Sequence, residues 1–318
     1  MMSEKGGLDD LRGEIDKIDR QILPLLDQRM ALALRIGEVK SGLGMGIHDP
    51  ERETGIIRDL LSYSHRYLTP QEIEEVYAAI FRISRWRQGG RERVGGHLCI
   101  SVLESDPERA RQGMMMAARE GDLVELRLDA LDEIRLNDLL PFTEGLLIVT
   151  NRRRGEGGFF RGKEEKRIAY LEEAIRYGVT YIDVEWMSPE PLRSRLLGKK
   201  GETGVILSYH NLQKTPPLEE LLSLWEDMIQ IDADIYKIVT WAQTLDDSLT
   251  VLRFLREAGG RGQRVISHCL GEEGKISRIL APLFGSFMAF ASPEGGEEAA
   301  PGQLRAGQMR RVWEVLMK

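Results

Sequence analysis

The spacing of apolar residues changes once along the chain, close to residue 90. Before that point apolar residues recur every three or four positions, which is the period of an amphipathic helix. After it, short apolar runs alternate with helix-length amphipathic stretches, which is typical of an α/β domain. The intervening segment 91–96 is rich in glycine, a composition that favours a flexible connection. We therefore predict a helical domain at residues 1–90, a linker at 91–96 and an α/β domain at 97–318.

The N-terminal pattern predicts three helices, of which the first is long. Its apolar face runs from Leu11 to Val39 with a helical spacing throughout. A helix of that length cannot bury its apolar face inside a domain of about 90 residues, so we expect a second copy of the chain to cover it. Pro24 lies inside this helix and is expected to weaken its hydrogen bonding. The third helix is predicted to begin at the capping box of Thr69 and Glu72.

Polar side chains occupy positions that the apolar pattern of these helices places inside. Arg29 stands where the first helix would have an apolar residue, and Lys40 follows eleven positions later on the same face. Ser84 and Gln88 continue the buried stripe of the third helix. Cations and hydrogen-bonding side chains on inward faces indicate a pocket for a small dianion. The alternative, a dimerisation helix with an arginine-rich surface, does not account for Arg29.

Together these residues resemble the all-helical class of chorismate mutase. The motifs that carry the resemblance are 11–16, the spacing from Arg29 to Lys40, 49–53, and Ser84 with Gln88. The resemblance implies an intertwined homodimer that converts chorismate to prephenate. It implies a site with Arg12, Arg29 and Arg52 on the two carboxylates, Lys40 and Gln88 on the ether oxygen, and Asp49, Glu53 and Ser84 around them. Arg12 is implied to serve the site of the partner subunit.

The apolar runs after residue 97 predict eight strands, each followed by a stretch compatible with a helix. The strands are expected at 98–103, 123–128, 146–150, 181–185, 205–209, 235–239, 265–269 and 286–291, and the clearest helices at 164–177, 218–231, 245–258 and 304–317. Eight consecutive βα units favour a (β/α)8 TIM barrel, with an open doubly wound sheet as the alternative. The chain is thus predicted to be multidomain, with an all-α three-helix domain before an α/β barrel.

Unusual polar residues fall at or after the C-terminal ends of the predicted strands, where barrel enzymes place their chemistry. They are Glu125, Arg127, Arg152, Glu156, Asp183, Glu185, His210, Lys237, Arg278 and Gln303. Lys237 is the most informative, because it interrupts an apolar run. Burial disfavours a charged ammonium and so yields a nucleophilic amine. The plain alternative is a lysine that reaches solvent or pairs with a carboxylate.

A buried lysine, a histidine on a neighbouring strand end and several arginines indicate imine formation with a ketone that bears a carboxylate. His210 is the expected base, and His268 at the end of the seventh strand is the alternative base by position. The sequence contains no Rossmann fingerprint, P-loop or zinc-ligand spacing. We therefore expect a reaction without a cofactor or metal.

Seven short motifs in this part of the chain closely resemble type I 3-dehydroquinate dehydratase. They are 125–129, 150–152 with 156–158, 208–211, 236–238, 271–278, 284–286 and 300–303. The resemblance implies that Lys237 forms a Schiff base with 3-dehydroquinate, that His210 moves the proton, and that Glu125 orients His210. The other residues implied to contact substrate are Arg278 and Gln303 at its carboxylate and hydroxyls, and Arg127, Arg152 and Glu156 along the pocket wall.

The chain departs from the pattern of this family at two places. Ala299 stands where the family usually has a serine in the segment that closes over the substrate. The run Cys269-Leu270-Gly271 lacks a methionine that is often found there. Neither change touches Lys237 or His210, so both bear on closure and substrate affinity more than on the reaction.

Composition narrows the expected partners. A net charge of -7, with 42% hydrophobic and 30% charged residues, is ordinary for a globular protein and argues against a general nucleic-acid binder. No segment has the character of a signal peptide or of a membrane span, so we expect a cytoplasmic protein with small-molecule substrates. Cys99 and Cys269 have no metal-ligand or disulfide spacing and are expected to be buried and reduced.

The sequence therefore predicts a bifunctional enzyme of the shikimate and aromatic amino-acid pathway, with a mutase followed by a dehydratase. One alternative keeps the dehydratase and makes residues 1–90 a non-catalytic dimerising or ligand-sensing domain. A second alternative makes the barrel another imine-forming lyase, such as a class I aldolase.

Overall fold

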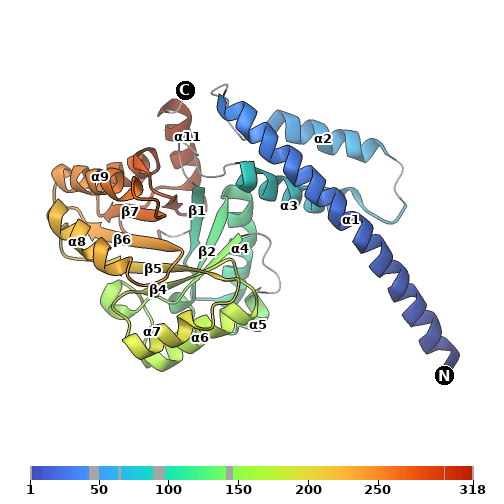
Figure 1. Ribbon diagram of the computed structural model, residues 1–318, viewed down its shortest axis with the longest axis horizontal. Coiled ribbons are helices and arrows are strands. Elements are labelled where there is room, and N and C mark those ends of the chain that lie inside the picture. The colour runs from blue at the N-terminus through green and yellow to red at the C-terminus, as the bar shows by residue number, and fades with distance from the viewer. Residues whose placement is uncertain are drawn as a thin grey trace. The chain divides into compact units, whose positions relative to one another are not determined.

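The computed structural model of the chain describes residues 2–42, 50–63, 66–88, 97–140, 146–296 and 298–316 (Figure 1). The chain separates into two compact units, Met1–Arg93 and Val94–Lys318. The division falls close to the predicted domain boundary. The predicted linker at 91–96 lies outside the described residues, as does Asp49.

Three helices form the first unit: α1 (Met2–Gly42), α2 (Pro50–Ser62) and α3 (Pro70–Gln88). α1 continues through Pro24 as one helix. The predicted capping box is confirmed at the start of α3. The backbone N–H of Thr69 donates to Glu72 at 2.7 Å, and the backbone N–H of Glu72 donates to Thr69 Oγ1 at 3.3 Å. These bonds satisfy amides that a helix start otherwise leaves without partners.

The apolar face of α1 is only partly covered within one chain. α1 packs on α3, and Ala33, Ile73 and Phe81 are buried in this unit. Eight apolar residues of α1 are instead between 46% and 64% exposed: Leu11, Ile15, Ile18, Ile22, Leu25, Leu32, Ile36 and Val39. An exposed apolar stripe of this length is typical of an interaction surface.

The second unit is a barrel of eight parallel strands. They are β1 (His97–Val102), β2 (Leu123–Arg127), β3 (Leu146–Thr150), β4 (Tyr181–Glu185), β5 (Gly204–His210), β6 (Ile235–Trp241), β7 (Val265–Leu270) and β8 (Met288–Ala291). The strands pair in sequence order, and β1 also pairs with β8. A parallel bridge between Val265 and Ser286 joins β7 to the residues just before β8 and closes the sheet. The predicted barrel is confirmed, and the open doubly wound sheet is wrong.

Helices follow the strands around the outside of the barrel (Figure 1). They are α4 (Pro107–Glu120), α5 (Leu136–Leu139), α6 (Glu164–Arg176), α7 (Glu190–Leu197), α8 (Leu218–Met228), α9 (Leu245–Gly259), α10 (Lys275–Leu280) and α11 (Ala306–Leu316), with short 3-10 helices η1 (Leu128–Ala130), η3 (Arg154–Glu156) and η4 (Ala281–Phe284). The layer between strands and helices is apolar, and Trp225 and Phe254 are fully buried there.

Side chains inside the barrel form layers, because successive inward-facing residues of a strand are two positions apart. The layer nearest the N-terminal ends of the strands is apolar and includes Leu123, Ile148, Ile206 and Ile235. Two positions further along the same strands stand Glu125, Thr150, Ser208 and Lys237. The C-terminal half of the barrel therefore has a polar interior on an apolar floor.

No helix in the described part of the chain is long and apolar enough to span a membrane. Within the same residues, no cluster of histidine, cysteine, aspartate and glutamate is placed to hold a metal ion. Cys99 and Cys269 are both free and buried. Burial raises the pKa of both thiols, which disfavours the reactive thiolate form.

Candidate active site

A cavity of about 290 Å³ lies within the polar C-terminal half of the barrel. All of the residues that the sequence assigned to a dehydratase site line it: Glu125, Arg127, Arg152, Glu156, His210, Lys237, Arg278 and Gln303. Ser101, His268 and Phe290 complete part of the wall. The structure thus brings together side chains that lie far apart in the sequence, as the barrel geometry predicts.

Lys237 lies on β6 and is 5% exposed. Its Nζ is 3.1 Å from Asp183 Oδ2 and 3.9 Å from Glu125 Oε1. It also lies 4.1 Å from the centroid of the Phe290 ring. The predicted burial of Lys237 is confirmed, but the amine is not buried alone, because two carboxylates and an aromatic ring surround it.

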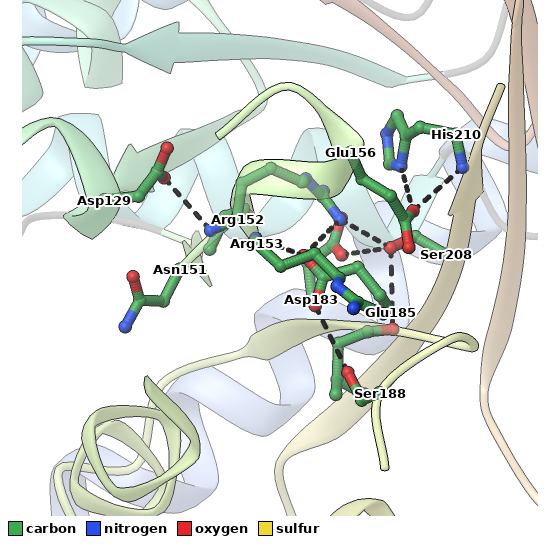
Figure 2. Close-up of polar contacts among 12 residues, drawn as sticks. Asp129, Asn151, Arg152, Arg153, Glu156, Asp183, Glu185, Ser188, Ser208 and His210 are labelled. Atoms are coloured by element: carbon green, nitrogen blue, oxygen red, sulfur yellow. Dashed lines mark hydrogen bonds and ion pairs between the residues drawn. The ribbon is translucent and has the colours of Figure 1, made fainter. Parts of the chain in front are cut away.

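His210 ends β5, and its carboxylate partner is Glu156 (Figure 2). Glu156 Oε2 accepts the backbone N–H of His210 at 2.9 Å and lies 3.1 Å from His210 Nδ1. With Nδ1 fixed in this way, the second ring nitrogen is left for a reacting group. Glu156 reaches His210 from η3, which folds back toward β5 after β3 ends.

The predicted hydrogen bond from Glu125 to His210 is wrong. The two carboxylate oxygens of Glu125 instead accept the hydroxyl of Ser101 at 2.7 Å and the hydroxyl of Thr150 at 2.8 Å. These two donors come from β1 and β3, the strands on either side of β2. Glu125 is therefore held near Lys237, and Glu156 takes the place beside His210 that the resemblance had given to Glu125.

Burial sets the protonation of the His210 and Glu156 pair. Burial, with Arg152 and Lys237 nearby, holds the pKa of His210 well below its usual 6.5. Burial, with the negative charge of Glu185, raises the pKa of Glu156 to about 8. At neutral pH the imidazole is thus neutral and the carboxyl holds a proton. Glu156 Oε1 is buried with no hydrogen-bond partner among the described residues.

Arg152 is the centre of a buried charge network (Figure 2). Its guanidinium donates to Asp183 at 2.8 Å, to Glu185 at 3.0 Å and to Ser208 Oγ at 2.7 Å. Burial lowers the pKa of Arg152, but Asp183 and Glu185 outweigh burial and raise it. The second oxygen of Glu185 pairs with Arg167 of α6 at 2.6 Å, with both side chains fully buried. The network therefore runs from an outer helix to the floor of the cavity.

Arg127 is held in a fixed orientation by Asp129. Its Nε and one terminal nitrogen donate to the two oxygens of Asp129 at 2.9 and 2.7 Å. Burial lowers the pKa of Arg127, but Asp129 outweighs burial and raises it. The other terminal nitrogen donates to the carbonyl of Ala299 at 3.3 Å, which ties the cavity wall to the segment after β8.

Arg278 and Gln303 also form hydrogen bonds with this segment. Arg278 donates to the carbonyl of Pro301 at 3.2 Å, and Gln303 accepts the backbone N–H of Ala299 at 2.9 Å. Burial lowers the pKa of Arg278 to about 10, and its Nε has no hydrogen-bond partner in the described part of the chain. A buried guanidinium with an unused donor suits an anionic group of a ligand.

His268 lies on the same cavity wall and is 6% exposed. In register, Val239 of β6 stands between His210 on one side and His268 on the other. Burial, with Arg278 and Lys237 nearby, holds the pKa of His268 well below its usual value. The alternative base therefore does reach the cavity, but the contact with Glu156 belongs to His210 alone.

Ser101, Asp183 and Ser208 are the residues whose part in the site the sequence left unassigned. Asp183 was noticed as a polar strand end but received no role, Ser208 belonged to the motif 208–211 without a role of its own, and nothing marked Ser101. The available signal was the alternation along each strand. Ser101 stands two positions after the buried Cys99, as Ser208 stands after Ile206, so both belong to the polar inward layer.

The helical unit brings one predicted pair together. Arg29 of α1 donates to the Oγ of Ser84 of α3 at 2.6 Å, and Ser84 donates in turn to the carbonyl of Ile80. Ser84 is buried, and the Arg29 guanidinium lies 5.5 Å from the centroid of the Phe81 ring. Arg29 therefore does point to the α1–α3 contact.

The other predicted mutase residues are spread over the three helices. Arg12 and Lys40 lie on α1, and Arg52 and Glu53 lie on the first turn of α2. Arg12 and Arg52 are exposed, whereas Lys40 and Glu53 are half-buried. Gln88 ends α3, and its side chain is outside the described part of the structure.

Comparison with known proteins identifies both units. Residues 98–318 match the family model of type I 3-dehydroquinase, and residues 11–89 match that of chorismate mutase type II. A 3-dehydroquinate dehydratase of Methanococcus maripaludis is 34% identical over 223 residues, which cover 69% of this chain and 99% of that protein. One of Desulfotalea psychrophila is 37% identical over 223 residues, 68% of this chain and 96% of that protein.

A solved structure gives the same result for the fold. The 3-dehydroquinate dehydratase of Geobacillus kaustophilus has a TM-score of 0.64 and 27% identity, over 72% of this chain and 92% of that one. The matches favour the bifunctional interpretation over both alternatives. The chain belongs to the type I 3-dehydroquinase family, and a chorismate mutase domain precedes its barrel.

Proposed function

We propose that the barrel converts 3-dehydroquinate to 3-dehydroshikimate through a Schiff base on Lys237, and that the helical unit rearranges chorismate to prephenate. The observation that carries the first part is the position of Lys237. Its amine faces a cavity that arginine, histidine and carboxylate side chains line, with the neutral imidazole of His210 on the neighbouring strand. A nucleophile and a base beside one cavity are what imine-dependent dehydration requires.

The reaction uses the two groups in turn. Lys237 attacks the ring ketone, and loss of water leaves a protonated imine. His210 then removes a proton from the adjacent carbon, and the electron pair of the broken C–H bond moves toward the imine nitrogen. The hydroxyl on the next carbon leaves with a proton as water, and hydrolysis of the product imine restores Lys237.

The surrounding residues hold the base and the substrate. Glu156 fixes the ring of His210 through Nδ1. Arg278, with its unused Nε, is the partner for the substrate carboxylate, and Gln303 faces the hydroxyls. Arg127 and Arg152 line the wall and are each already bound to carboxylates. They therefore shape the cavity more than they neutralise the substrate.

The mutase reaction needs no base, because chorismate rearranges within itself. The protein has to hold the reactive shape and to place positive charge where the breaking ether bond becomes negative. Arg29, fixed by Ser84, is the best-placed cation for this work. Arg12, Arg52, Lys40, Gln88, Glu53 and Asp49 are proposed to complete the site.

We infer a homodimer in which α1 of one chain covers α1 and α3 of its partner. The exposed apolar stripe of α1 supports this inference, since a lone chain leaves Leu11, Ile18 and Leu25 more than half exposed. In such a dimer Arg12 serves the site of the partner subunit. The cytoplasmic location of the enzyme stays a prediction.

Borohydride trapping tests the barrel chemistry. The full chain is incubated with 3-dehydroquinate and borohydride, digested, and mapped by mass spectrometry. We expect a reduced adduct on the peptide that contains Lys237 and none in Lys237→Ala. An adduct on another lysine, or none in the native chain, contradicts the mechanism. Chorismate turnover that disappears in Arg29→Ala tests the helical unit in the same preparation.

A further inference from the structure

Asp183 lies behind the lining of the cavity, beside the reacting nitrogen. It lies on β4, is fully buried, and its Oδ2 is 3.1 Å from Lys237 Nζ. The same oxygen accepts a hydrogen bond from Arg152 at 2.8 Å, and Oδ1 accepts the Ser208 hydroxyl at 2.6 Å. None of the dehydratase roles described above uses this carboxylate.

The surroundings of Asp183 favour its negatively charged, deprotonated form. Burial alone would raise its pKa, but Arg152 and Lys237 outweigh burial and hold the pKa below the usual range. The charged or titratable groups that face Asp183 and Lys237 are Arg152 of the loop after β3, His210 of β5, Glu125 of β2, His268 of β7 and Cys99 of β1. Of these only Arg152 shares an oxygen with Lys237.

The other carboxylates near Lys237 are less suited to pair with a charge on its nitrogen. Glu125 is 3.9 Å away, and both of its oxygens already accept hydroxyl hydrogens. Glu156 bonds His210 and has a pKa of about 8, so it holds a proton at neutral pH. Glu185 is paired with two arginines, Arg152 and Arg167.

We propose that Asp183 is the counter-ion of the Lys237 imine and keeps the imine nitrogen protonated during the reaction. This inference rests on the proposed Schiff base. The ammonium of Lys237 gives up a proton before its nitrogen attacks the ketone, and the carbinolamine then takes up a proton and loses its hydroxyl as water. The net products are an iminium and one water, so a single positive charge stands on the same nitrogen before and after. Asp183 therefore meets a cation before and after imine formation and need not move.

The protonated nitrogen is what makes the next step possible. When His210 takes the proton from the neighbouring carbon, the electron pair flows into the iminium, giving a neutral enamine and an imidazolium. A deprotonated imine would accept that pair far less readily. Arg152 limits the effect, because it shares Oδ2 and so prevents Asp183 from holding the cation too strongly.

Asp183→Asn tests the assignment, with Glu185→Gln as the matched control. Glu185 is equally buried and bonds the same arginine, but its ion-pair partners among the described residues are Arg152 and Arg167, not Lys237. Each protein is mixed with 3-dehydroquinate, and reduction by cyanoborohydride, which acts on protonated imines, is compared with reduction by borohydride. Mass mapping counts the adduct on Lys237, and circular dichroism reports folding.

The expected result is a shift in the pH at which the ratio of the two rates falls. The ratio of cyanoborohydride to borohydride trapping is measured from about pH 6 to about pH 11. In Asp183→Asn the fall in this ratio moves to lower pH by about one unit or more, because a close opposite charge changes a protonation equilibrium at least tenfold. In Glu185→Gln it moves by less than about half a unit, even if turnover falls. A ratio with an unchanged pH dependence in Asp183→Asn, or an equal shift in both variants, overturns the proposal.

The native chain provides a second test if Asp183→Asn does not fold. With Asp183 in place, the trapping ratio of the native protein stays flat from about pH 6 to about pH 9. A ratio that falls steadily over this range contradicts a counter-ion. The two proposals fail separately: no adduct on native Lys237 with either reagent removes the Schiff base itself, whereas an adduct with an unaltered pH dependence of the ratio removes only the role of Asp183.

Discussion

The cationic side chains of the barrel and of the helical unit have different kinds of partner. In the barrel, Arg127, Arg152 and Lys237 are buried, and each has a carboxylate partner within the same chain. In the helical unit, Arg29 finds a neutral hydroxyl at Ser84, and the apolar face beside it is exposed. We therefore propose that one chain completes the barrel site, whereas the helical site needs a second chain.

Lys237→Ala should have the largest effect on the barrel. Without the amine no imine forms, so dehydration of 3-dehydroquinate falls to the background rate. Chorismate turnover by the same sample should remain, since Lys237 belongs to the other unit. The dehydratase rate is read from the absorbance of its conjugated enone product, and the mutase rate from the loss of chorismate absorbance. A loss of both activities would show that the two units are not independent.

His210→Ala should lower kcat for dehydration by about 10²- to 10⁴-fold, the usual contribution of a positioned base. His268→Gln should lower it by less than about tenfold, because His268 has no bond to Glu156. The native acid limb should lie below pH 6.5, because burial lowers the pKa of His210. A larger loss of kcat in His268→Gln than in His210→Ala would make His268, and not His210, the base.

Arg29→Ala should lower chorismate turnover by about 10²- to 10³-fold, the size of one lost electrostatic contact in a transition state. Arg29→Lys keeps the positive charge but lacks the planar guanidinium, so it should retain more chorismate turnover than Arg29→Ala but less than the native chain. Steady-state rates with chorismate measure both, and the dehydratase rate serves as the internal control. Full activity in Arg29→Ala would support a non-catalytic helical domain.

Glu156→Gln should change how the stability of the barrel depends on pH. The pKa of Glu156 is raised to about 8 from 4.5, so the folded state favours the protonated form. The native barrel therefore loses stability as the pH rises from 4.5 toward 8, whereas the Gln variant keeps no such charge. The free energy of unfolding in urea is measured for both proteins at pH 5 and pH 9. Relative to the native chain, the variant should be more stable at pH 9 than at pH 5, by on the order of a few kcal/mol. The same difference in unfolding free energy between variant and native chain at both pH values would contradict the raised pKa of Glu156.

The sequence was most informative where a strand carried a continuous apolar run. The third strand, β3, begins and ends where the pattern predicted, because a buried parallel strand is a continuous apolar run. β4 also has its predicted ends, although Asp183 and Glu185 interrupt its apolar run. The last strand is shorter than predicted, since Ser286 makes only a bridge to Val265.

The partner of His210 could not be read from the sequence. Glu156 belongs to a short 3-10 helix after β3, and a loop residue has no periodicity that reveals its direction. Glu125 lies in a regular strand at a conspicuous position, so the role of orienting His210 was assigned to Glu125. Which carboxylate reaches His210 depends on how the loop folds back, and that is a property of the tertiary structure.

The role of Asp183 was hidden for a different reason. Its position at a strand end was evident, but its contacts with Lys237, Arg152 and Ser208 depend on the stagger of neighbouring strands.

The dimer, in contrast, is predicted from the sequence, and the structure of a single chain does not test it. The apolar stripe is plain in the sequence, and the structure of one chain leaves it exposed.

The most direct test of the comparison is to measure both activities of the native chain during serial dilution. A site completed within one chain keeps its rate per chain at every concentration, whereas a site shared between two chains loses activity when the dimer dissociates. We predict a constant dehydratase rate per chain and a mutase rate per chain that falls on dilution, with sedimentation following the dissociation. A mutase rate that stays constant in demonstrably monomeric protein would contradict the account.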